Sequence, residues 1–144
     1  MFTRLLARLS APEPEQLNEA DARHALGALL VRIARADEQY DEIERARIQN
    51  VLATRYSLSP ADAVQLCEEA EALEAQAPDT VRFTRAIKEA VPHEQRLGVI
   101  EAMWSIVLTD GARDPREDAL LRLLSKLLGI SDRDSALARQ RVSS

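Results

Sequence analysis

One short pattern of acidic residues occurs twice in the chain, each time between two stretches with helical periodicity. Both copies read Asp-x-x-x-Asp-x-x-Glu, over residues 37–44 and 110–117. Apolar residues spaced by three and four positions precede and follow each copy, which is typical of amphipathic helices. The six acids that share these positions are Asp37, Asp41, Glu44, Asp110, Asp114 and Glu117. The repeat therefore predicts two related helix-turn-helix halves.

The composition agrees with a fold made only of helices. Hydrophobic residues make up 46% of the 144 residues and charged residues 30%, with only four glycines. Such a chain is too apolar to be disordered and too poor in glycine for a turn-rich β protein. Its length suits one domain of ordinary size. We therefore expect an all-α fold, a compact bundle of about seven or eight helices.

Apolar spacing and capping residues place the helix boundaries. Ser59-Pro60 marks a helix start, because Ser caps the first turn and Pro suits the first helical position. Gly129 marks a helix end, because Gly readily takes the left-handed conformation. In the main body we expect one helix ending near residue 36, helices over 41–56, 60–77, 79–91, 92–107 and 114–128, and a short last helix after Ser131.

Two features of these helices predict how they pack. Six leucines lie between residues 120 and 128, and they cover so much of the 114–128 helix that we expect it at the centre of the bundle. Gly27 and Gly98 fall inside helices, where Gly costs about 1 kcal/mol relative to Ala. We expect each glycine to mark a close crossing of two helices.

The first residues form a separate segment. Phe2, Leu5, Leu6 and Leu9 follow helical spacing, and prolines at 12 and 14 interrupt the chain after them. We divide the chain into residues 1–14, a short helix with a Pro-rich linker, and residues 15–144, the main domain. The short helix either binds a membrane surface or partner, or packs on its own domain. Packing is favoured, since one short helix buries little in a membrane.

Charge and cysteine content limit the partners and the compartment. The net charge is −5 and the basic residues are dispersed, so no basic face for nucleic acid is expected. The single Cys67 fits a reducing compartment. No apolar run approaches the roughly 20 residues of a membrane span, and the first residues lack the apolar core of a secretory signal. We expect a cytoplasmic protein.

A structural role explains the repeated acids. Asp114 with Glu117 forms a capping box, in which each side chain bonds backbone N–H groups at the helix start, and Asp41 with Glu44 repeats it. Negative charge there also complements the helix dipole. Asp110 before Gly111 suits a helix exit.

A cation site is the second interpretation of the same six acids. Three carboxylates within eight residues are hard oxygen ligands that suit Ca²⁺ or Mg²⁺. An EF-hand is excluded, because its twelfth position requires Glu, whereas counting from Asp37 or Asp110 reaches Ile48 or Leu121. Capping alone, and capping with a bound divalent cation, are both left open.

The repeated helix–acidic turn–helix unit resembles the TerB-like family of tellurite-resistance proteins. The resemblance covers about residues 20–135 and rests on the six acids with Ala36 and Gly111; the first copy departs from it at Glu38 and the second at Thr109. It implies a compact bundle in which the two turns form one acidic, metal-binding patch. It also implies a role in tellurite or other chemical stress, within membrane-associated assemblies.

The remaining residues favour binding over catalysis. Neither His24 nor His93 belongs to a metal-binding pair of histidines. We expect Cys67 to be a buried thiol and Trp104 to lie in the core. We therefore expect a binding or scaffold domain with a protein partner, with self-association left open. The alternative is a helical interaction module whose acids only cap helices. A metal-dependent hydrolase is the least favoured, since no His or Lys near the turns is placed as general acid or base.

Overall fold

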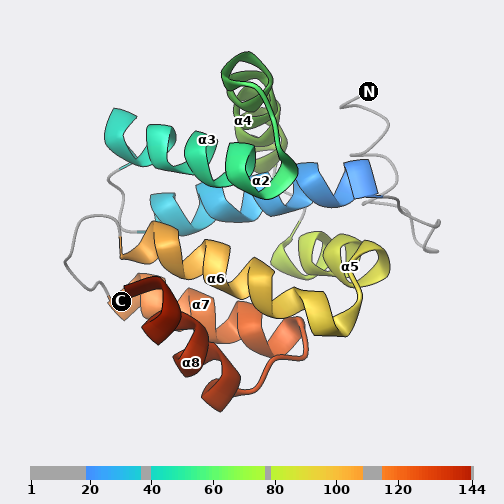
Figure 1. The fold of residues 1–144 in the computed structure, drawn as a ribbon, viewed down its shortest axis with the longest axis vertical. Coiled ribbons are helices and arrows are strands. Elements are labelled where there is room, and N and C mark those ends of the chain that lie inside the picture. The colour runs from blue at the N-terminus through green and yellow to red at the C-terminus, as the bar shows by residue number, and fades with distance from the viewer. Residues whose placement is uncertain (1–18, 37–39, 77–78, 109–114, 144) are drawn as a thin grey trace.

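The fold is all-helical, as predicted. The computed structural model describes residues 19–36, 40–76, 79–108 and 115–143, and in these ranges it contains seven α-helices, one 3₁₀ helix and no strand (Figure 1). The elements are α2 (Glu19–Arg35), α3 (Glu42–Tyr56), α4 (Pro60–Ala75), α5 (Thr80–Ala90), η1 (His93–Gln95), α6 (Arg96–Val107), α7 (Pro115–Leu127) and α8 (Asp132–Ser143). The helix and linker expected over residues 1–14 lie outside the described residues.

Helix α2 lies at the centre of the bundle. It contacts α3, α4, α5, α6 and α7, and Figure 1 shows it running through the middle of the molecule. A helix that is apolar on all its faces is one that a fold buries. The residues of α2 that are buried in the core are Ala22, Ala25, Leu26, Ala28, Leu29, Leu30, Val31, Ile33 and Ala34. The small alanines among them let several neighbouring helices approach this helix.

The leucine-rich helix is not central, and that prediction was wrong. Leu121 and Leu124 of α7 are buried, but Leu123 is 47% exposed. Helix α7 therefore buries one face and leaves another open to solvent. The leucine content of α7 was misleading, because apolar residues are also common on protein surfaces. The central helix α2 instead combines small buried residues with large ones.

The two glycines inside helices differ in what they face. A Cβ on Gly27 would lie 2.7 Å from the Cβ of Ala70, so α2 and α4 cross closely there, as predicted. A Cβ on Gly98 would instead meet the side chain of Arg55, 3.0 Å from its Nη1. Gly98 therefore makes room for an arginine, and the expected close crossing of two helices at this position was wrong.

Capping residues end and begin the helices where the sequence predicted. The Ser59 hydroxyl accepts a hydrogen bond from the N–H of Asp62 at 3.1 Å, with Pro60 in the first turn of α4. Gly129 has φ +76° after α7, and the Ser131 hydroxyl then caps α8. These local signals fixed the boundaries because each satisfies backbone groups that a helix end leaves unpaired.

The helices on either side of the two acidic turns run in matching directions. In Figure 1, α2 and α6 both run from right to left, and α3 and α7 both return from left to right. Helices α2 and α6 also contact each other. Whether the two pairs are structurally related halves stays a prediction. Among the described helices, none combines the length and the apolar character that crossing a membrane requires.

Candidate functional site

The first acidic turn joins α2 to α3, and its second acid caps α3. Asp41 has extended backbone angles, and its Oδ1 accepts a hydrogen bond from the N–H of Glu44 at 2.9 Å. This bond satisfies one of the donors that a helix start leaves unpaired, and the carboxylate complements the helix dipole. The capping role predicted for Asp41 is therefore confirmed, and its side chain remains exposed.

The last acid of each repeat is buried. Glu44 in α3 is 8% exposed and Glu117 in α7 is 2% exposed, whereas the neighbouring Glu42 and Arg116 are exposed. Both buried carboxylates lie in the first turn of their helix, where backbone N–H groups point out of the helix end. The two copies thus share the burial of one acid as well as their spacing.

The other three predicted ligands, Asp37, Asp110 and Asp114, lie outside the described residues. Within the described ranges alone, no group of three or more His, Cys, Asp and Glu side chains is placed to hold a metal ion. The cation site built from all six acids therefore stays a prediction.

Tyr40 anchors the end of the first acidic turn to α4. Its hydroxyl donates to Glu71 Oε2 at 2.6 Å, and Arg45 Nε donates to the same oxygen at 2.9 Å. Arg35 lies over the Tyr40 ring, 5.1 Å from its centroid. This cluster holds together α2, α3 and α4 beside the turn. This cluster was not predicted from the sequence. The available signal was Tyr40 itself, because the second acidic repeat contains no aromatic residue.

Burial and the nearby carboxylate keep the groups around Tyr40 protonated. Burial, and then the hydrogen bond to Glu71, raise the pKa of Tyr40 far above its ordinary value. Burial is also the main reason why the pKa of the Cys67 thiol is raised, and the charge of Glu71 adds to it. The predicted buried thiol is confirmed, since Cys67 has no exposed surface.

A second charged cluster extends the anchoring to α5. Glu74 of α4 accepts from Arg32 Nε at 3.2 Å and from Arg35 Nη1 at 2.5 Å. Arg32 also donates to the Thr80 hydroxyl at 3.2 Å. The last turn of α2 is therefore tied to two neighbouring helices immediately before the acidic turn begins.

The two histidines lie away from the acidic turns. His24 Nε2 is 2.9 Å from Glu69 Oε1 near the start of α2, and His93 Nε2 is 3.1 Å from the Gly129 carbonyl before α6 begins. The turns follow the opposite ends of these helices, which lie 11 residues after His24 and 14 residues after His93, or roughly 16 Å and 21 Å at 1.5 Å per residue.

The side chain of Trp104 belongs to the core, as predicted. It is 8% exposed, and its Nε1 donates to the Ser135 hydroxyl at 3.1 Å.

Comparison with known proteins assigns the family. The family model described as tellurite resistance protein TerB matches residues 23–140, which include every helix from α3 to α7 and most of α2 and α8. No significant match was found among curated proteins or among solved structures. The match covers most of the chain and both acidic turns. This chain therefore belongs to the TerB family of tellurite-resistance proteins.

Proposed function

We propose that this protein is a binding or scaffold domain whose two acidic turns together hold a divalent cation, Ca²⁺ or Mg²⁺ by ligand type. The observation that carries the proposal is the burial of Glu44 and Glu117 at equivalent positions of the repeat. Burying a carboxylate is costly unless opposite charge or hydrogen bonds compensate it. The N–H groups at the two helix starts already stabilise the negative charge of these carboxylates. A cation bound at the turns would stabilise it further.

The placement of the two turns supports a shared site. Each turn follows a helix that ends on the same side of the molecule in Figure 1, after α2 and after α6. The TerB match supports a role related to tellurite resistance. We extend this role to the response to tellurite or other chemical stress. We propose that the protein acts in the cytoplasm and binds a protein partner in a membrane-associated assembly.

Two observations favour the alternative, a helical interaction module without a cation. Asp41 already caps α3, so its carboxylate has a complete structural role. Ile43, in the first turn of α3, is 71% exposed and offers an apolar contact beside the turn. A hydrolase has less support than either, since both histidines lie about a helix length from the turns.

Cation-dependent stability distinguishes these functions. Thermal unfolding of EDTA-treated protein is measured with Ca²⁺, Mg²⁺, Mn²⁺ or Zn²⁺ added. We expect at least one cation to raise Tm in the native protein. We expect the increase to be lost when Asp110→Asn is combined with Glu117→Gln, and to be reduced by Asp41→Asn. No increase with any of the four cations would refute the cation site and leave the interaction module.

The matched control is Asp79→Asn. Asp79 caps α5 as Asp41 caps α3, by accepting from the N–H of Arg82 at 2.9 Å. Asn is about as good an N-cap as Asp, so both variants keep their caps. Only Asp41→Asn should alter the cation response.

A further inference from the structure

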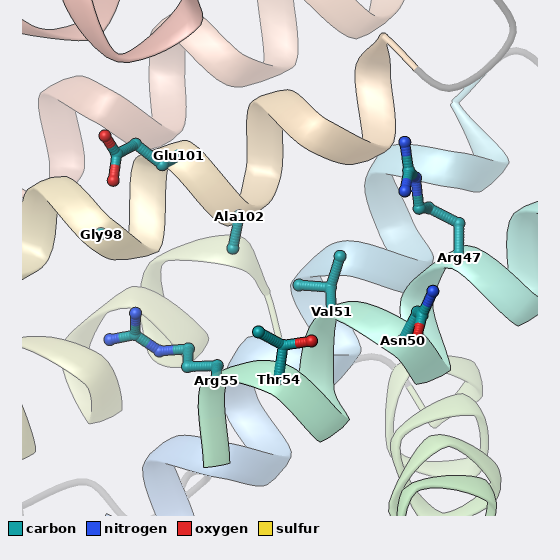
Figure 2. A pocket seen from close by; sticks show the side chains of 8 residues that line it. All are labelled: Arg47, Asn50, Val51, Thr54, Arg55, Gly98, Glu101 and Ala102. Carbon is teal, nitrogen blue, oxygen red and sulfur yellow. The ribbon is translucent and has the colours of Figure 1, made fainter. Parts of the chain in front are cut away.

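A groove between α3 and α6 has no part in the proposed cation site. Its volume is about 450 Å³, within the range of pockets that take small molecules. Helix α3 forms one wall and α6 the other, as Figure 2 shows. The residues that line it are Arg47, Asn50, Val51, Thr54, Arg55, Gly98, Glu101 and Ala102.

Arg55 is the unusual residue of this groove. Its Nε is buried and has no hydrogen-bond partner among the described residues, and no described carboxylate forms an ion pair with it. Its guanidinium carbon lies over the Tyr56 ring, 5.7 Å from the ring centroid. The N–H groups in its plane point outward in a fork that matches carboxylate or phosphate oxygens.

Among the residues that the structure describes, no acidic side chain pairs with Arg55. Glu101 is the acid that lines the groove, and it pairs with Arg141 at 2.9 Å. Figure 2 shows Glu101 on α6 and Arg55 on α3, on opposite walls of the groove. Although the whole chain carries a net charge of −5, this groove is locally basic, and such a region attracts anions.

Gly98 and the apolar lining define the space beside the guanidinium. A Cβ on Gly98 would lie 3.0 Å from Arg55 Nη1, so the missing side chain gives the guanidinium its place. Val51 and Ala102 lie between Arg55 and Arg47 in Figure 2 and give the middle of the groove an apolar surface. The two arginines are eight residues apart on α3, which corresponds to roughly 12 Å.

We propose that this groove binds a small organic anion, whose carboxylate or phosphate group is held by Arg55 and whose apolar part lies against Val51 and Ala102. Arg55 lines the groove, so the bound group would accept hydrogen bonds from the terminal Nη N–H groups of its guanidinium. A bidentate contact with a guanidinium is among the strong hydrogen bonds of proteins. The ligand would enter from solvent along the face that α3 and α6 share.

The test is a titration of the full chain followed by ¹H–¹⁵N NMR, at an ionic strength held constant with NaCl. The probes are hexanoate, n-hexyl phosphate and inorganic phosphate. We expect saturable shifts at the backbone amides of Arg55 and Gly98 with hexanoate or n-hexyl phosphate, and the tighter of these two identifies the anionic group. Inorganic phosphate should bind about tenfold more weakly, since it lacks the apolar part.

Two variants and a control assign the site. Arg55→Gln should weaken binding by about tenfold or more, because it removes a charge-assisted hydrogen bond. Gly98→Ala should weaken it too, since the added Cβ displaces the guanidinium; this variant decides the question if Arg55→Gln does not fold. Arg133→Gln on α8, an exposed position outside the groove, removes the same charge and should bind as the native protein does.

Three results would overturn the proposal. The first is the absence of saturable shifts with both organic anions. The second is unchanged binding in the folded Arg55→Gln or Gly98→Ala variant. The third is inorganic phosphate binding as tightly as n-hexyl phosphate, which would mean that the apolar part of the groove contributes nothing.

Discussion

Gly27 of α2 and Ala70 of α4 lie so close that a Cβ atom on Gly27 would be 2.7 Å from the Cβ of Ala70. Both positions are in the interior, and Ala70 has no exposed surface. A Cβ moves only with its backbone, so the contact can lengthen only if the two helices separate. Because α2 is the central helix, a change at this close crossing affects the packing of the whole bundle.

We expect Gly27→Ala to destabilise the protein, although Ala is the better helix former. The gain in helix propensity is at most about 1 kcal/mol, whereas overpacking a well-filled core costs typically about 1–3 kcal/mol. The free energy of unfolding, measured by urea denaturation, should therefore fall. A more stable Gly27→Ala variant would show that α2 and α4 separate readily.

Gly98→Ala should have the opposite effect on stability. Its added Cβ meets the end of the flexible Arg55 side chain, which can move aside without displacing a helix. The helix-propensity gain should then dominate, and we expect the free energy of unfolding to rise by about 0.4–1 kcal/mol. The same denaturation series checks it, and destabilisation would mean that the Arg55 side chain is held rigidly.

Removal of the capping carboxylates should destabilise α3 and α5 by similar amounts. Asp41→Ala and Asp79→Ala each remove an acceptor for a backbone N–H, at 2.9 Å in both cases. Each change should lower the free energy of unfolding by about 0.5–2 kcal/mol. Measurement in EDTA keeps the comparison free of cations. Asp41→Asn and Asp79→Asn should keep the caps and lose less stability. If they are as unstable as the Ala variants, loss of the caps does not explain the destabilisation.

Stability should decrease at alkaline pH because of Tyr40 and Cys67. The folded state raises both pKa values, so it retains protons that the unfolded state loses. Stability is then fully present below the unfolded pKa values and falls as pH rises above about 8.5 for the thiol and about 10 for the phenol. Urea denaturation between neutral and alkaline pH measures the decline.

Single variants separate the two contributions to this decline. Tyr40→Phe should flatten the part at the higher pH, and Cys67→Ala the part that begins at the lower pH. Since both changes also alter packing, the slope against pH is compared and not the stability at one pH. An unchanged slope in both variants would assign the decline to other groups.

Much of the fold followed from local sequence signals. Ser59, Asp41 and Gly129 marked helix ends correctly, because a cap satisfies nearby backbone groups and needs no tertiary partner. The acidic repeat indicated the TerB family, which the family match over residues 23–140 supports. Each of these features depends on residues that lie within a few positions of one another in the chain.

The candidate sites were harder to predict from the sequence. The Tyr40–Glu71 bond joins residues 31 positions apart, and no local pattern pairs them. Arg55 and Gly98 look unrelated in the sequence, and only the packing of α3 on α6 brings them together.

The sequence by itself determined the helices, their ends and the repeated acids, because helix formation and capping depend on residues within about one turn of each other. The tertiary structure decided which helix is central and what each glycine faces. In the folded protein α2 is central and α7 has an exposed face. Gly27 faces the Cβ of Ala70, which moves only with its backbone, whereas Gly98 faces the flexible side chain of Arg55. Those outcomes depend on how side-chain volumes from distant segments fill a common interior, which helical periodicity does not encode.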